Sequence, residues 1–157
     1  MKRLALLLTL CIALPVALFA ADNPLAGTWK LNLEKSKMPA GTTPKSLTRT
    51  VTVDGENLKY TFEGQAADGS AINYSFTVKL GGDPAEVTGT GAPMGADHVA
   101  LKQTNSHMLS GSLMKGGKDI AKTTVTVSHD GKTATVVSEG TGPDGKPFNS
   151  TSLYDKQ

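Results

Sequence analysis

The hydrophobic pattern is clearest in residues 26–33, where large apolar side chains alternate with polar ones. Trp29, Leu31 and Leu33 fall on one face of an extended chain, and the residues between them are Thr, Lys and Asn. A period of two is typical of a strand with one buried face. Because Trp29 is the only tryptophan and the largest side chain of this face, we expect it to anchor the core.

The same alternation recurs in short segments along the rest of the chain. Most of these segments are separated by turn residues, and Asp54-Gly55 and Asp130-Gly131 are examples of the Asp-Gly pair that favours a tight hairpin. Residues 34–46 lack an apolar period and are expected to form a loop or a short cap. The expected strands cover residues 26–33, 47–53, 58–66, 71–80, 86–90, 98–103, 108–115, 119–127, 133–140 and 147–156.

Short connections of this kind predict an all-β domain in which consecutive strands are antiparallel neighbours. No pattern of helical length follows the N-terminal segment. We therefore predict a single up-and-down β-barrel of about ten strands, since closure removes the exposed edges of such a sheet.

An internal repeat supports this arrangement. The Thr-Val-Thr-Val run at 50–53 reappears at 124–127, and Asp-Gly, Glu-Gly and Asp-Gly pairs follow both runs in the same order. The second copy has two additional residues in its first turn, Ser128 and His129. Each copy predicts a meander of three strands, and the match of turns and strand lengths favours duplication or structural pseudo-symmetry.

The two copies differ in the side chains that they are expected to turn inward. The first is bulky and aromatic, and the second is mostly small or hydroxylic. A barrel filled from one side leaves a cavity of the kind that binds small molecules; the alternative is a barrel that flattens and closes on itself. The facing walls are expected to be Tyr60, Phe62, Tyr74 and Phe76 on one side and Ser138, Ser150 and Ser152 on the other.

The N-terminal residues have the composition of a secretory signal peptide. Lys2 and Arg3 precede an apolar run at 4–19, and Ala20 and Ala21 supply small residues for cleavage. We predict a signal peptide helix at 1–20, a mature β-barrel domain at 21–157, and a periplasmic or secreted location. The alternative is an uncleaved membrane anchor.

Cleavage also changes the charge balance and the chemistry of the chain. The full sequence has 16 basic and 14 acidic residues, so the mature domain without Lys2 and Arg3 is formally neutral. A neutral domain has no basic surface for nucleic acid and no polybasic patch for a membrane. Cys11 is removed too, which excludes a disulfide and a thiol enzyme.

The Gly27-Thr28-Trp29 motif on the first of about ten strands resembles the opening of the lipocalin and fatty-acid-binding (calycin) superfamily, including the lipocalin-like domains of secreted bacterial proteins. The resemblance implies that Trp29 packs at the closed end of a barrel. The fatty-acid-binding branch has a two-helix lid after its first strand, and 34–46 is too short for one. Ser152-Leu153-Tyr154 keeps the tyrosine of that branch's Arg-x-Tyr but not its arginine, and no late arginine is present to stack on the tryptophan.

Arg49 is the only arginine of the mature chain, and alternation places it on the apolar face. Three interpretations stay open: it anchors an acidic ligand group through its fork of donors, it covers Trp29, or it bends out to water. We expect a monomer that binds a small apolar or amphipathic ligand. The predicted ligand contacts are Arg49, Tyr60, Phe62, Tyr74, Phe76, Ser150, Ser152 and Tyr154.

No constellation for catalysis, metal binding or a cofactor is predicted. His98, His107 and His129 are scattered along the sequence, and turn chemistry accounts for the aspartates of the Asp-Gly pairs. Two other functions stay open besides the binding barrel. One is an enzyme that uses carboxylates or histidines as bases; the other is a structural or interaction module of the cell envelope with a closed core and no ligand.

Overall fold

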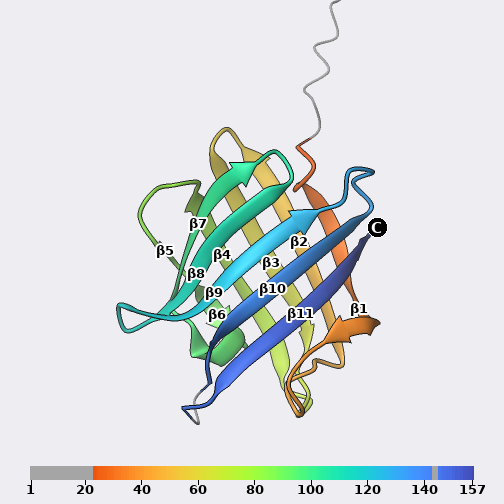
Figure 1. Cartoon of the computed structure of the whole chain (residues 1–157), viewed down its shortest axis with the longest axis vertical. Coiled ribbons are helices and arrows are strands. Elements are labelled where there is room, and N and C mark those ends of the chain that lie inside the picture. The colour runs from red at the N-terminus through yellow and green to blue at the C-terminus, as the bar shows by residue number, and fades with distance from the viewer. Residues whose placement is uncertain (1–22, 143–144) are drawn as a thin grey trace, which may run out of the picture.

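The computed structural model describes residues 23–142 and 145–157 and shows an antiparallel β-barrel (Figure 1). The predicted signal peptide at 1–20 lies outside the described residues. A single turn of 3-10 helix, η1 (Pro93–Gly95), precedes β7. The strands are β1 (Gly27–Lys37), β2 (Ser46–Asp54), β3 (Asn57–Gln65), β4 (Ala71–Lys79), β5 (Ala85–Glu86), β6 (Thr88–Thr90), β7 (His98–Asn105), β8 (Met108–Lys115), β9 (Lys118–Val127), β10 (Thr133–Thr141) and β11 (Pro147–Lys156).

The strand order confirms the predicted up-and-down architecture. Strands β7 to β11 pair in sequence, β11 pairs with β1, and β1 to β4 again pair in sequence. The ring is completed by a segment that changes partners at Val87: β5 pairs with β7, and β6 pairs with β4. The single strand expected at 86–90 is therefore wrong, because the N–H of Val87 turns to the carbonyl of Asp97 and splits the segment into two short strands.

The end of β1 also differs from the prediction. The strand continues to Lys37 instead of giving way to a loop at residue 34, and its pairing with β11 shifts between Asn32 and Lys37. The Ser36 hydroxyl donates to the carbonyl of Asn32 (2.6 Å) and accepts the N–H of Leu153 (2.9 Å), which fixes this bulge. Between the pairs that Asn32 and Lys37 make, β1 advances five residues and β11 only two, so the alternation of faces is interrupted, and Leu33 is 43% exposed rather than buried.

The two repeat copies form equivalent meanders, β2–β4 and β9–β11. In both, the glycine of the Glu-Gly pair lies close against the backbone of the neighbouring strand. A Cβ on Gly64 would collide with the carbonyl oxygen of Ser46, and one on Gly140 would collide with that of Ile120. The pseudo-symmetry read from the sequence is present in the packing.

Trp29 is fully buried at the end of the barrel near the start of β1, as predicted. Its indole N–H donates to the carbonyl of Leu25 (3.2 Å), itself a buried residue. The ammonium of Lys156 lies 5.1 Å from the ring centroid. Although the sequence lacks a late arginine, a late lysine thus covers the tryptophan from β11.

Candidate functional site

A cavity of about 740 Å³ occupies the barrel interior in the part of the chain that the structure describes. All eight residues expected to contact a ligand line it; whether they bind one stays a prediction. A barrel with this interior is not the closed core of the alternative interpretation. The eight are Arg49, Tyr60, Phe62, Tyr74, Phe76, Ser150, Ser152 and Tyr154.

One wall of the cavity is aromatic and comes from β3 and β4. These strands pair so that Phe62 lies beside Tyr74 and Tyr60 beside Phe76. The ring centroids of Phe62 and Tyr74 are 4.4 Å apart, and those of Tyr60 and Phe76 are 4.9 Å apart, both pairs stacked. Rings fixed by their neighbours give a preformed apolar surface, which lowers the entropy cost of binding.

A second wall is hydroxylic and comes from β9, β10 and β11, which cross the barrel in front of β2–β4 in Figure 1. Ser138 pairs with Ser150 across β10 and β11, and its hydroxyl donates to that of Thr123 on β9 (3.3 Å). The sequence identified these serines through the repeat, because they occupy the positions that aromatic residues hold in the first copy. Thr123 was missed.

Arg49 lies at the deep end of the cavity, where β2 pairs with β1 at Trp29. It is 3% exposed, so the interpretation as a side chain bent out to water is wrong. The guanidinium carbon lies 4.5 Å from the ring centroid of Tyr154 and 5.5 Å from that of Trp29. Arg49 therefore covers the tryptophan, and it also faces the ligand space.

The guanidinium of Arg49 has neither a hydrogen bond nor an ion pair within the described residues, and its Nε is buried. Interactions with aromatic faces offset only part of the cost of burying a charge. Five donors are thus available at the deep end of an apolar cavity.

Three tyrosines of the cavity lie within the electrostatic influence of this cation. Burial raises the pKa of Tyr60, Tyr74 and Tyr154 above that of an exposed phenol, while the charge of Arg49 acts in the opposite direction. The hydroxyls stay protonated at neutral pH and can donate. None of the three has a hydrogen bond to another described residue. The deep end of the cavity is polar and unsatisfied, whereas its side wall is aromatic.

The mouth lies at the opposite end of the barrel from Trp29. It is lined by the β1–β2 loop, including Met38 and Pro39, by the segment 91–96 around η1, and by Gly142 and Lys146 between β10 and β11. Met94 has a φ of 55° and is the one non-glycine residue of the described chain with a positive φ. Its side chain lines the cavity rim, where a bulky residue in this backbone conformation is uncommon.

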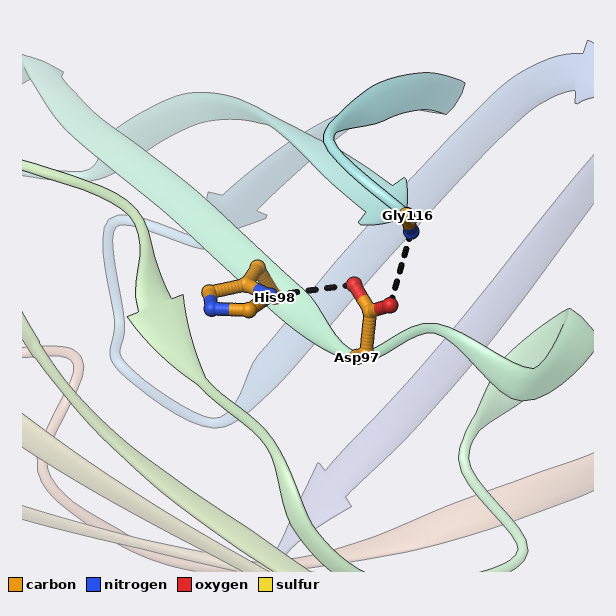
Figure 2. Close-up of polar contacts among 3 residues, drawn as sticks. All are labelled: Asp97, His98 and Gly116. Atoms are coloured by element: carbon orange, nitrogen blue, oxygen red, sulfur yellow. Dashed lines mark hydrogen bonds and ion pairs between the residues drawn. The ribbon is translucent and has the colours of Figure 1, made fainter.

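Asp97 ties the segment after η1 to the β8–β9 turn (Figure 2). Its carboxylate accepts the N–H of Gly116 (2.7 Å) and lies 3.0 Å from Nδ1 of His98. These hydrogen bonds, first that of Gly116, hold the pKa of Asp97 below its ordinary value. The carboxylate links two segments at the mouth by hydrogen bonds and does not line the cavity.

Among the described residues, no group of three or more His, Cys, Asp and Glu side chains could hold a metal ion, and no helix has the length and apolar character needed to cross a membrane. The histidines are nevertheless less scattered than the sequence indicated. His107 and His129 meet at the closed end of the barrel, with ring centroids 5.0 Å apart.

Comparison with known proteins identifies relatives of the fold rather than of the sequence. No family model matches the chain, and no curated protein sequence does. Zebrafish ileal bile acid-binding protein, solved in complex with cholic acid, matches with a TM-score of 0.56 and 12% identity, over 85% of this chain and 99% of that one. A redesigned β-barrel, mFAP1, bound to DFHBI, gives a TM-score of 0.50 and 16% identity, over 85% and 95%.

Lobster apocrustacyanin A1 also resembles the chain, with a TM-score of 0.47 and 15% identity over 87% of this chain and 63% of that one. Identities this low describe shared architecture only. The meander order, the closure of β11 on β1 and the matches to the bile acid-binding protein and to mFAP1 agree: the chain has the up-and-down β-barrel fold of these two proteins.

Proposed function

We propose that this protein is an exported monomeric carrier or sensor of a small amphipathic acid and performs no catalytic step. The apolar part of the ligand packs on the aromatic wall, and its acidic group pairs with Arg49. Barrels of this size have room for one small ligand. The observation that carries the proposal is the buried guanidinium of Arg49, which faces the cavity without a hydrogen-bonding partner.

A ligand anion would supply the counter-charge and the hydrogen-bond acceptors that Arg49 lacks among the described residues. An unpaired buried charge is costly, and a carboxylate, sulfonate or phosphate restores both its charge balance and its hydrogen bonds. Arginine presents its donors as a planar fork that matches two oxygens at once. The protonated hydroxyls of Tyr60, Tyr74 and Tyr154 add further donors at the same end.

Displacement of a bound fluorescent probe, anilinonaphthalene sulfonate, tests this proposal with three competitors of equal chain length: dodecanoic acid, dodecanol and dodecylamine. We expect affinities in the order acid, alcohol, amine. Arg49→Met should lower the affinity for the acid by at least about tenfold and change the affinity for the alcohol little. The reason is that a charge-assisted hydrogen bond contributes about 1.5–3 kcal/mol.

The matched control is Lys156→Met. Lys156 also lies over the ring of Trp29, but it does not line the cavity. It should therefore leave the preference for the acid intact. A parent protein that binds neither the probe nor any competitor would refute ligand binding. Equal affinity for acid and alcohol would leave ligand binding in place and refute only the pairing of Arg49 with the acidic group.

Export is the second half of the proposal and rests on the composition of residues 1–21. N-terminal sequencing of the protein recovered from the culture medium and from the cell-envelope fraction tests it. We expect a chain that begins near Ala21. A chain that begins at Met1 would contradict cleavage.

A further inference from the structure

Two histidines from different turns meet at the closed end of the barrel. His107 lies in the β7–β8 turn and just before β8, and His129 lies in the β9–β10 turn. Strands β8 and β9 pair from Met108 and Thr126 onward, which brings the two turns side by side. Their ring centroids are 5.0 Å apart and the rings are tilted by 47°. Neither residue lines the ligand cavity.

Both turns are held in place by hydrogen bonds. The carbonyl of His107 accepts the N–H of Val127 (2.8 Å), which joins the first turn directly to the second. The N–H of His107 donates to Oδ1 of Asn105 (2.9 Å), and that of Thr133 donates to Oγ of Ser128 (3.0 Å). The backbones of the two turns are therefore fixed next to each other.

The inserted residues of the second repeat create this pair. Ser128 and His129 have no counterpart in the first copy, where Asp54-Gly55 directly follows the Thr-Val-Thr-Val run. The first copy thus closes its turn without a histidine. The longer turn carries His129 to His107, which belongs to the neighbouring hairpin.

The spacing of the rings fits two imidazoles that share one ion. A metal–nitrogen bond of about 2.0–2.1 Å places each ring centroid about 3.2 Å from the metal. Two such rings are then about 4.5 Å apart at a right angle and about 5.2 Å apart at the tetrahedral angle. The observed separation of 5.0 Å lies within this range.

The available donor atoms also suit a metal. Nδ1 of His107 is 3.0 Å from the hydroxyl of Ser106. When this nitrogen donates its hydrogen to the hydroxyl, Nε2 carries the lone pair that a metal requires, and the ring is oriented from behind. The ring of His129 has no hydrogen bond to another described residue.

We propose that His107 and His129 form a two-histidine site for a divalent transition metal ion, with Cu²⁺ bound most tightly. Imidazole pairs favour Cu²⁺, Ni²⁺ and Zn²⁺, and Cu²⁺ is the strongest of these in the usual order of affinities. Mg²⁺ and Ca²⁺ require oxygen ligands. The nearest aspartate of these turns, Asp130, is engaged by the Ser128 hydroxyl (2.6 Å) and the N–H of Lys132 (3.1 Å), so water completes the coordination.

Calorimetric titration of the untagged mature protein with Cu²⁺, with Mg²⁺ as the negative ion, tests the site. Three variants are compared with the parent: His107→Gln, His129→Gln and, as the matched control, His98→Gln. We expect one Cu²⁺ per chain for the parent and the control. Each of the other two variants should weaken binding by at least about tenfold, because loss of one ligand removes the gain from two linked contacts.

A second readout identifies the ligands without mutation. Substoichiometric Cu²⁺ should broaden the ring proton signals of His107 and His129 in NMR spectra and leave those of His98 sharp. Equal broadening of all three, or equal affinity in all three variants, would show that the two rings merely stack and would overturn the proposal. Urea denaturation of the metal-free variants verifies that each folds as the parent does.

Discussion

At the residue scale, the closed end of the barrel depends on one tryptophan and two cations. Arg49 and Lys156 both lie over the ring of Trp29, and the first of them also faces the cavity. Gly27 makes this possible. A Cβ at this position would lie 2.6 Å from Cε of Lys156, so any larger residue would push the lysine off the ring. The glycine of the Gly-x-Trp motif is thus required for two reasons: a side chain would clash with Lys156, and the φ of Gly27 is 127°.

Trp29→Ala is expected to be the most destabilising single aromatic truncation in the chain. Its indole is fully buried and hydrogen-bonded to Leu25, and the loss of such a ring costs about 3–5 kcal/mol. Urea denaturation monitored by circular dichroism measures the change. Phe148→Ala serves as the comparison, because this side chain is only partly buried. A midpoint unchanged by the tryptophan variant would show that the core is anchored elsewhere.

At the element scale, the alternating pattern and the Asp-Gly turns predicted most strands to within a few residues. The errors lie where a strand contains a bulge or changes its pairing partner, so that the alternation of side chains is interrupted. The bulge after Asn32 depends on the Ser36 hydroxyl, and no apolar period marks it. The change of partners at Val87 depends on which strands lie on either side, which a local pattern does not contain.

The two meanders should respond alike to the same substitution. Gly64→Ala and Gly140→Ala each place a Cβ against a neighbouring carbonyl, and overpacking of this kind costs about 1–3 kcal/mol. Chemical denaturation of the two variants is expected to give similar losses. A large loss for one and none for the other would mean that the copies are not packed equivalently.

The hydrogen-bonded carboxylate of Asp97 at the mouth predicts that the stability of the fold depends on pH. The folded pKa of Asp97 is below the ordinary 3.8, so its stabilisation is fully present above that value and is lost as the pH falls through the lower folded pKa. The difference in unfolding free energy between the parent and Asp97→Asn should therefore shrink in strong acid. Urea midpoints measured from neutral pH down to about pH 2 follow the loss.

Asp119→Asn is the control for this series, because Asp119 is an exposed carboxylate at the same end of the barrel. The difference in unfolding free energy between Asp119→Asn and the parent should stay constant over the same pH range. A parallel, pH-independent offset for Asp97→Asn would instead assign its effect to packing rather than to charge.

At the scale of the whole molecule, the cavity follows from the inequality of the two repeats. The sequence predicted both of its walls, because the aligned copies place aromatic residues such as Phe76 opposite serines such as Ser150 in the barrel. It left three interpretations of Arg49 open, one of which was that it covers Trp29. Alternation turned this residue inward, but its position between Trp29 and Tyr154 depends on the pairing of β2 with β1 and of β1 with β11. The meeting of His107 with His129 likewise requires the strand order.

Filling the hydroxylic wall should remove binding without harming the fold. Ser150→Phe directs a ring into space that is open, so we expect displacement of the fluorescent probe to be lost and the urea midpoint to be retained. In a closed core the same change would cost about 1–3 kcal/mol. Ser150→Ala, which adds no volume, should keep both properties.

The change of partners at Val87 leaves one weakly paired junction in the barrel, formed by β5 and β6 and called the seam here. The other strand pairs share at least four paired residues, whereas β5 contributes two residues and β6 three. Backbone amides at this seam should exchange their hydrogens with solvent sooner than those of β3 or β10, because fewer bonds must break together for it to open. If bound ligand leaves by this route, its residence time is set by the frequency of that opening, and substitutions at the seam change how long the cargo is held without changing what is held.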